Sequence, residues 1–104
     1  MLPLHAARAR ALETNPPPTL ASLRPRGGSA TLALRCHLPA CVACDAFARD
    51  GRDAYEREHL GHAAILDWDC SRPRHRRLAR EAGVDALPAY VLLTRDGRAT
   101  VRRP

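Results

Sequence analysis

Residues 36–44 read Cys-His-Leu-Pro-Ala-Cys-Val-Ala-Cys, and this stretch decides how the rest of the chain is interpreted. Its last two cysteines, Cys41 and Cys44, are separated by two residues, and no proline follows them as far as His59. A cysteine at the start of a helix lies near unpaired backbone N–H groups and the positive end of the helix dipole, which together stabilise a thiolate. The spacing therefore favours a reactive cysteine pair at a helix N-terminus.

Apolar runs and turn residues on either side of the pair predict alternating strands and helices. The expected strands cover 29–36, 63–68, 89–94 and 98–102, and the last two are joined by the turn signal Asp96-Gly97. The expected helices cover 41–59 and 74–82. Gly51 interrupts the first helix, which packs Val42, Phe47 and Tyr55 on the sheet, and Gly83 closes the second. The helical crossover makes the first two strands parallel, and the tight turn makes the last two antiparallel.

The first 28 residues precede this pattern. Leu4–Thr14 is rich in Ala, Arg and Leu and predicts a helix, which Asn15 and the three prolines at 16–18 end. Residues 19–23 can add one helical turn before a connection that contains Pro25, Gly27 and Gly28. We therefore divide the chain into an N-terminal helix with a Pro/Gly-rich connection over 1–28 and a main domain over 29–104.

This order of elements resembles that of the thioredoxin-like superfamily. The likeness covers about residues 29–102 and is carried by Cys41-Val42-Ala43-Cys44, Ile65-Leu66-Asp67-Trp68-Asp69, Pro73, Ala79, Gly83, Val84, Pro88 and Gly97. It implies an α/β fold, a thioredoxin-like three-layer sandwich with a mixed sheet. We expect the usual C-terminal helix to be lacking, because the sequence stops at Pro104. A sheet face left uncovered in this way would favour self-association.

The resemblance also implies a chemistry. It makes Cys41 the exposed nucleophile that attacks a substrate disulfide, and Cys44 the cysteine that resolves the mixed disulfide. It gives Leu87-Pro88 a cis peptide bond that faces the pair, so that both residues shape the substrate groove. The implied function is that of a thiol-disulfide oxidoreductase that acts on protein disulfides or dithiols with a redox partner and needs no cofactor.

Several residues depart from the pattern of that superfamily. Ala40 replaces the aromatic residue before the first cysteine, and the buried acid of the preceding strand is replaced by Arg35 or Cys36. The intervening Val42-Ala43 leaves the reduction potential open over the roughly 150 mV that related sites span. The alternative function is therefore a catalytically degenerate binding module of the same fold, which would tolerate the loss of Cys41.

The cysteine spacing also admits an iron-sulfur cluster. Cys36, Cys41, Cys44 and Cys70 match a plant-type pattern of four and then two intervening residues followed by a distant fourth ligand. Against a cluster, residues 38–39 stiffen a loop whose N–H groups would have to reach the sulfides. The metal expectation for this chain is therefore none.

Zinc is a further alternative, because Cys41, Cys44 and Cys70 could bind it together with His75 or His37. Without a metal, Cys70 is expected to be a buried thiol. Cys36 could then pair with Cys41 or Cys70 on oxidation, so we treat Cys36 and Cys70 as accessory thiols.

All seventeen basic residues are arginine, and the formal net charge is +6. Five of them gather at the predicted 74–82 helix as a solvated face that hints at an acidic partner: Arg72, Arg74, Arg76, Arg77 and Arg80. No nucleic-acid motif or interleaved aromatic residue accompanies them, so we expect no nucleic-acid partner. No stretch approaches the roughly 20 apolar residues of a spanning helix, and no signal peptide is recognisable, so we expect no membrane partner and a cytoplasmic setting.

Overall fold

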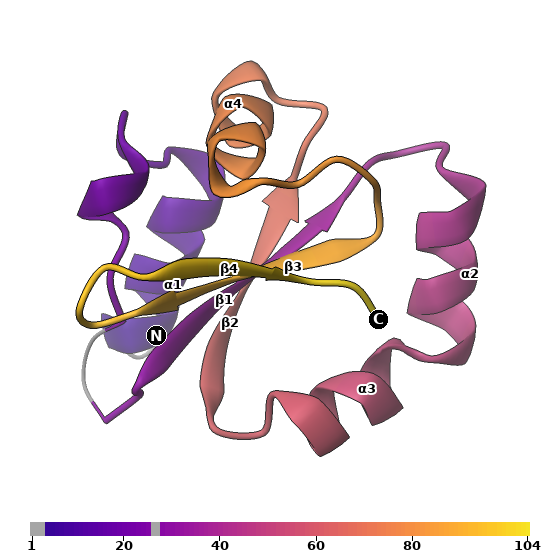
Figure 1. Ribbon diagram of the computed structural model, residues 1–104, viewed down its shortest axis with the longest axis horizontal. Coiled ribbons are helices and arrows are strands. Elements are labelled where there is room, and N and C mark those ends of the chain that lie inside the picture. The colour runs from indigo at the N-terminus through magenta and orange to yellow at the C-terminus, as the bar shows by residue number, and fades with distance from the viewer. Residues whose placement is uncertain (1–3, 26–27) are drawn as a thin grey trace.

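The computed structural model describes residues 4–25 and 28–104, and it shows a sheet between two layers of helices (Figure 1). In chain order the elements are α1 (Leu4–Thr14), the 3-10 turn η1 (Leu20–Ser22), β1 (Thr31–His37), α2 (Val42–Asp50), α3 (Arg52–His59), β2 (Ala63–Asp69), α4 (Pro73–Ala82), β3 (Ala89–Thr94) and β4 (Ala99–Arg102). Residues 1–3 and 26–27, which belong to the expected N-terminal segment and connection, lie outside the described residues.

The four strands form one mixed sheet in the order β2-β1-β3-β4. β1 runs parallel to β2, and β3 is antiparallel to both β1 and β4. The predicted parallel and antiparallel pairings are thus confirmed, and so is the α/β sandwich. Gly83 (φ 107°) ends α4 and Gly97 (φ 87°) turns the last hairpin, both in the left-handed region that glycine adopts without strain.

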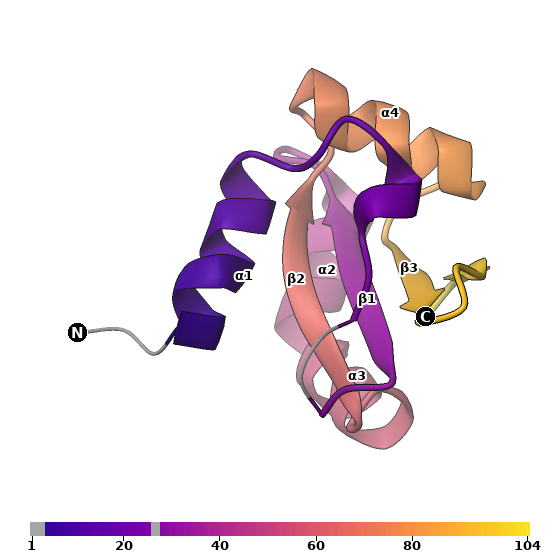
Figure 2. The same cartoon turned by 90° about the vertical axis from the view of Figure 1, so that its left-hand side faces the viewer.

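The larger core lies between the sheet and the layer formed by α1, η1 and α4, which Figure 2 shows on one side of β2 and β1. Its buried members are Leu23, Leu32, Leu34, Cys36, Leu66, Trp68, Cys70, Leu78, Ala79, Val91 and Leu93. Trp68 is fully buried at its centre, and its indole N–H donates to the backbone oxygen of His75 at 3.0 Å. This face of the sheet therefore carries most of the apolar burial that stabilises the domain.

A smaller core lies on the opposite face, under α2 and α3. It is built on Ala33, Leu60 and Tyr90, and the Tyr90 ring stacks on Tyr55 with centroids 5.4 Å apart. Gly51 separates α2 from α3, as the sequence predicts. The expected packing of Val42 is wrong: its side chain is 85% exposed, because it occupies the first position of α2 and points away from the sheet.

Arginines of the α4 region hold the end of α1 and the proline segment in place. Arg72 donates to the Thr14 oxygen at 2.9 Å, Arg74 to the Pro16 oxygen at 2.8 Å and Arg77 to the Pro18 oxygen at 2.8 Å. The last carbonyls of a helix have no partner within it, and the three prolines here offer no N–H groups. These three side chains are exposed, as expected of a solvated face, and in addition they are occupied with backbone oxygens.

We expect the Arg74→Ala, Arg77→Ala double variant to loosen the N-terminal segment without unfolding the domain. Each change removes a charge-assisted hydrogen bond of an exposed side chain, and Arg77→Ala also removes the ion pair with Glu81, so the double variant should lose about 2 kcal/mol of unfolding free energy. Hydrogen exchange should rise over residues 8–23 and stay unchanged over β1 and β3. Arg76→Ala, in the same helix, is the control, and equal protection of residues 8–23 in all three proteins would contradict this role.

Candidate active site

The two cysteines of the Cys-x-x-Cys motif meet at the start of α2. Cys41 and Cys44 form a disulfide, with their Cα atoms 5.2 Å apart. Cys41 is the N-cap residue of α2, and its Sγ accepts the backbone N–H of Cys44 at 3.1 Å. The predicted pair at a helix N-terminus is thus present, and the helix dipole and this N–H are placed to stabilise a negative charge on the Cys41 sulfur.

The two sulfurs differ in access. Cys41 is half-buried, whereas Cys44 is only 5% exposed. Ala40, which precedes the pair, has φ 57°, a left-handed conformation that costs a non-glycine residue roughly 1–2 kcal/mol. This backbone turn ends the loop after β1 and lets the helix begin with Cys41 at the surface. The exposed side chain of Val42 lies beside it.

A groove of about 360 Å³ opens beside Cys41. Its apolar wall includes Leu38 and Leu87, and Cys70 also lines it. Arg76 and Arg80 contribute positive charge to the same groove. Leu87, a predicted groove residue, thus shares a groove with the predicted nucleophile.

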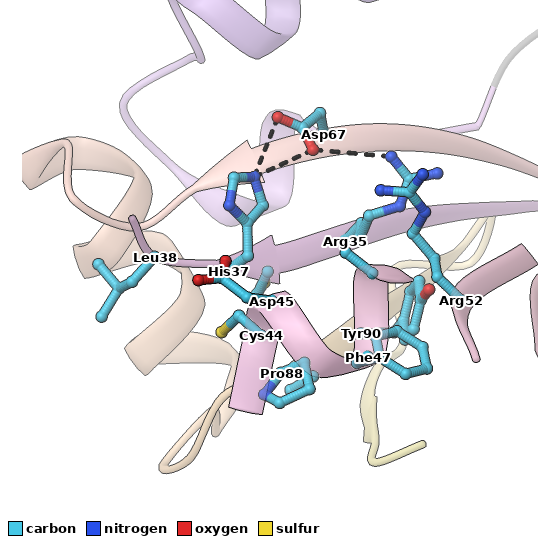
Figure 3. Close-up of a pocket in the computed structure, with 13 residues that line it drawn as sticks. Arg35, His37, Leu38, Cys44, Asp45, Phe47, Arg52, Asp67, Pro88 and Tyr90 are labelled. Carbon is cyan, nitrogen blue, oxygen red and sulfur yellow. Dashed lines mark hydrogen bonds and ion pairs between the residues drawn. The ribbon is translucent and has the colours of Figure 1, made fainter. Parts of the chain in front are cut away.

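A smaller cavity of about 100 Å³ lies behind Cys44, and Figure 3 shows its lining. Pro88, which follows the cis Leu87-Pro88 peptide bond, lines this cavity together with Cys44 and Cys36. The expected cis bond is thus present. The cavity is large enough to hold water, which needs only about 10–15 Å³ of such space.

Arg35, which lines the same cavity, belongs to an ion pair that the sequence does not predict. Arg35 donates from Nε and from a terminal nitrogen to the Glu56 carboxylate at 2.6 and 2.7 Å, and Tyr90 donates its hydroxyl to the same carboxylate at 2.5 Å. Arg35 is on β1 and Glu56 comes from α3. The ion pair therefore joins β1 to the helix layer that contains α3.

This contact shifts the ionisation of its members. Burial alone would raise the pKa of Glu56, but hydrogen bonds from Arg35 and Tyr90 and the charge of Arg35 together hold that pKa below its usual value. Burial, and then the nearby Glu56 carboxylate, raises the pKa of Tyr90 well above its ordinary value. At neutral pH the group is therefore an arginine cation, a carboxylate anion and a neutral tyrosine.

We expect Glu56→Gln to lower the unfolding free energy at neutral pH by about 2 kcal/mol, because it leaves the partly buried Arg35 without its main counterion. The wild-type carboxylate has a lowered pKa, so its contribution is present above the unfolded value of about 4.3 and is lost as the pH falls through the folded-state pKa. Urea unfolding of both proteins between pH 2 and 7 tests this. The difference should shrink below pH 4, and a constant difference would contradict the assignment.

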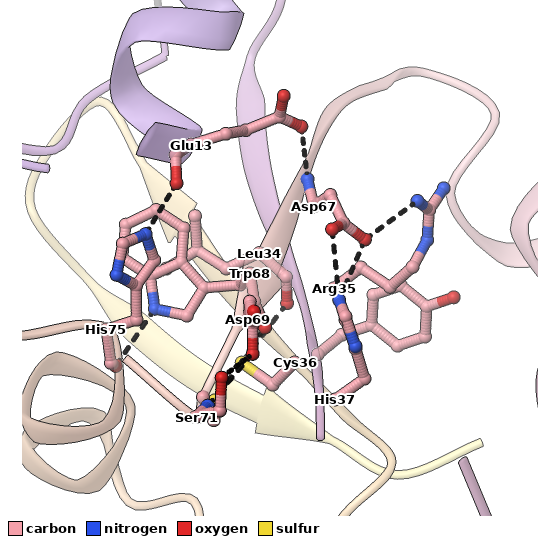
Figure 4. A network of polar contacts seen from close by, with 12 residues as sticks. Glu13, Leu34, Arg35, Cys36, His37, Asp67, Trp68, Asp69, Ser71 and His75 are labelled. Carbon is pink, nitrogen blue, oxygen red and sulfur yellow. Dashed lines mark hydrogen bonds and ion pairs between the residues drawn. The ribbon is translucent and has the colours of Figure 1, made fainter. Parts of the chain in front are cut away.

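Asp67 links this group to His37. The His37 Nε2 lies 3.0 Å from an Asp67 carboxylate oxygen, and Arg35 lies 3.6 Å from the same carboxylate. Figure 4 shows the Asp67 carboxylate between the His37 ring and the Arg35 guanidinium, with Glu13 of α1 accepting the Asp67 backbone N–H. The hydrogen bond to Asp67 raises the pKa of His37, and the same bond lowers the pKa of Asp67. His37 is thus half-buried and paired with a carboxylate.

The structure sorts the four cysteines into two pairs. Cys41 is bonded to Cys44, whereas Cys36 and Cys70 are free and buried. Among the described side chains, those of residues 8–25 and 28–104, no three of His, Cys, Asp or Glu gather as metal ligands. The iron-sulfur and zinc alternatives therefore lack the convergence of ligands that they require. Among the same residues no helix is both long and apolar enough to cross a membrane.

The chain is similar to three solved structures. The first thioredoxin domain of mouse Protein disulfide-isomerase A4 matches with a TM-score of 0.52 and 21% identity, over 72% of this chain and 53% of that one. The Neisseria meningitidis DsbD C-terminal domain, in its oxidised and reduced forms, matches with a TM-score of 0.46 and 19% and 18% identity, over 93% of this chain and 76% of that one. No protein-family model and no curated protein matches the sequence.

The protein therefore has a thioredoxin-like fold. It combines this fold with a bonded Cys-x-x-Cys pair at the N-terminus of α2. The chain spans about half the length of the mouse domain that it matches.

Proposed function

We propose that this protein is a thiol-disulfide oxidoreductase that exchanges disulfides with protein substrates through Cys41 and Cys44. The observation that carries the proposal is the position of Cys41, whose half-buried sulfur caps α2 and accepts the Cys44 N–H at 3.1 Å. A thiolate at this position is stabilised by the helix N-terminus and remains within reach of solvent. Cys41 is therefore the nucleophile, and the buried Cys44 is the resolving cysteine.

The exchange takes place in two displacements. The Cys41 thiolate attacks one sulfur of a substrate disulfide, forming a Cys41–substrate bond and releasing the other substrate sulfur as a thiolate, which takes up a proton from water. Cys44 then loses its proton to solvent and attacks the Cys41 sulfur. The Cys41–Cys44 disulfide forms and the second substrate thiolate leaves, so the substrate gains two electrons and the pair loses two. Run backwards, the same steps oxidise a substrate dithiol.

The surroundings of Cys41 fit a peptide substrate. The groove beside Cys41 has an apolar wall that includes Leu38 and Leu87, and Val42 adds an exposed apolar side chain next to the sulfur. Such a surface receives the apolar side chains that flank a disulfide in a polypeptide. Arg76 and Arg80 in the same groove favour substrates with acidic residues near the disulfide.

A redox titration tests the proposal. The protein is equilibrated in glutathione or dithiothreitol buffers of defined potential, free thiols are trapped, and the modified cysteines are mapped by mass spectrometry. We expect a reversible Cys41–Cys44 disulfide with a potential between about −120 and −270 mV, the range of working thiol-disulfide catalysts. If the two cysteines never pair in solution, the fold serves as a binding module instead.

A further inference from the structure

Cys36 and Cys70 lie side by side on one face of the sheet. β1 and β2 are neighbouring parallel strands in which Cys36 is paired with Trp68, and the backbone N–H of Cys70 donates to the His37 oxygen at 2.8 Å. Residues 36, 68 and 70 point to the same face, because side chains alternate along a strand. Figure 4 shows Cys36 next to the turn after β2, where Asp69 and Ser71 flank Cys70 in the sequence. The two thiols therefore converge from adjacent strands.

Both thiols are shielded from solvent. Cys36 is 1% exposed and Cys70 is 4% exposed, and both belong to the larger core. Each is also within weak hydrogen-bonding distance of a backbone oxygen of its own strand, 3.6 Å to Leu34 for Cys36 and 3.8 Å to Trp68 for Cys70. Dissolved oxidants therefore have little direct access to this pair.

The pKa values of the two thiols are shifted in opposite directions. A hydrogen bond from Cys36 lowers the pKa of Cys70, and so do the charge of His37 and a backbone hydrogen bond with His37. Burial and the charge of Asp69 raise the pKa of Cys70, but the lowering effects are larger. The same hydrogen bond to Cys70, followed by burial, raises the pKa of Cys36 far above its usual value. Cys70 is thus the member of the pair that ionises first.

Cys70 also lines the groove of about 360 Å³ that Cys41 lines. We propose that Cys36 and Cys70 form a second, internal redox pair that exchanges two electrons with the Cys41–Cys44 disulfide through this groove. The inference rests on the proposed function of Cys41 and Cys44. It makes the protein a carrier of up to four electrons and gives the accessory thiols a role.

The electrons and atoms balance within the chain. The Cys70 thiolate attacks the Cys41 sulfur, forming a Cys70–Cys41 bond and releasing Cys44 as a thiolate. Cys36 then gives up its proton, which the Cys44 thiolate or water accepts, and attacks the Cys70 sulfur. The Cys36–Cys70 disulfide forms and Cys41 leaves as a thiolate. The internal pair is oxidised by two electrons and the surface pair is reduced by two, with no external reductant.

The test follows the disulfides over time. The fully reduced protein receives one molar equivalent of diamide, samples are quenched with acid, and the linkages are mapped by mass spectrometry after alkylation in denaturant. We expect the Cys41–Cys44 disulfide first and a Cys36–Cys70 disulfide at its expense. The rate of the second step should not change over a tenfold range of protein concentration, because the step is intramolecular.

Two matched variants make the result decisive. In Cys41→Ser the entry point is lost, so formation of the Cys36–Cys70 disulfide should slow at least tenfold. In Cys36→Ser the internal disulfide cannot form and Cys44 reverses any attack by Cys70, so the Cys41–Cys44 disulfide should persist, and Cys36→Ala replaces this variant if it does not fold. An unchanged rate in Cys41→Ser, or no Cys36–Cys70 disulfide in the wild type, overturns the inference. If the Cys41–Cys44 disulfide forms and the internal pair stays reduced, the proposed function survives alone; if neither forms, both are wrong.

Discussion

Cys41→Ser should reduce disulfide turnover to the rate of the protein-free blank. Cys41 is the more accessible sulfur of the surface pair, and Cys44 is only 5% exposed, so Cys44 cannot replace it as the attacking group. Serine keeps the size of the side chain and can still accept the Cys44 N–H, so the start of α2 should be preserved. The measurement is the reduction of a peptide disulfide with dithiothreitol as electron donor, together with far-UV circular dichroism to establish that the variant is folded.

Two further variants separate nucleophile from resolving cysteine. Cys44→Ser should complete the first displacement and stop there, so that Cys41 is recovered as a mixed disulfide with the peptide. Val42→Ala changes an exposed side chain between the two cysteines and should keep the rate within about fivefold, since its two methyl groups contribute about 1 kcal/mol at most. Turnover above one tenth of wild type in Cys41→Ser would show that another thiol does the chemistry.

Trp68→Ala should be the most destabilising single change in the core. Trp68 is fully buried, and replacing such a side chain by alanine costs about 3–5 kcal/mol. The indole N–H also donates to the His75 oxygen, which would lose its donor. A domain of this size has a total stability of about 5–15 kcal/mol, so the variant should be partly unfolded at physiological temperature. Its Tm should fall by more than about 12 °C.

Urea unfolding followed by circular dichroism measures this effect, because the chain has only one tryptophan and the variant has no tryptophan fluorescence. Trp68→Phe is the control, since it keeps most of the ring volume and removes the indole donor. It should lose roughly 1–3 kcal/mol, the cost of leaving a buried acceptor unpaired. A loss below 1 kcal/mol in Trp68→Ala would mean that the core around α4 packs differently.

Local patterns were sufficient to predict the elements and the surface pair. The apolar runs of β1, β2 and β3, the glycine after α4 and the Asp96-Gly97 turn all lie where their residues meet the local requirements of strands, helix ends and hairpins. The Cys41–Cys44 spacing is local in the same way, since one helical turn brings the two sulfurs together. Expectations of this kind need only the geometry of a few consecutive residues.

What was missed depends on how distant elements dock. Several acidic residues lie between Cys44 and β2 in the sequence, and Glu56 is one of them. Only the rotation of α3 against the sheet decides that Glu56, and not another acid, pairs with Arg35. The contact between Cys36 and Cys70 depends on the register of β1 against β2, and a shift of one residue would separate the thiols. Val42 was misplaced because helical periodicity does not show how far the first turn extends beyond the sheet.

The anchoring of α1 has a consequence for the order of events during synthesis. The hydrogen bonds that hold α1 and the proline segment join residues far apart in the sequence. The shortest separation is 54 positions, between Glu13 and Asp67, and the longest is 62 positions, between Glu13 and His75. At about 5–20 residues per second, a ribosome needs roughly 3–12 s to make that much chain after α1 has been translated. A helix of eleven residues is marginal on its own in water, so α1 has to wait undocked for its partners. Translation speed over β2 and α4 therefore sets how long the nascent N-terminal segment is exposed to proteases and chaperones.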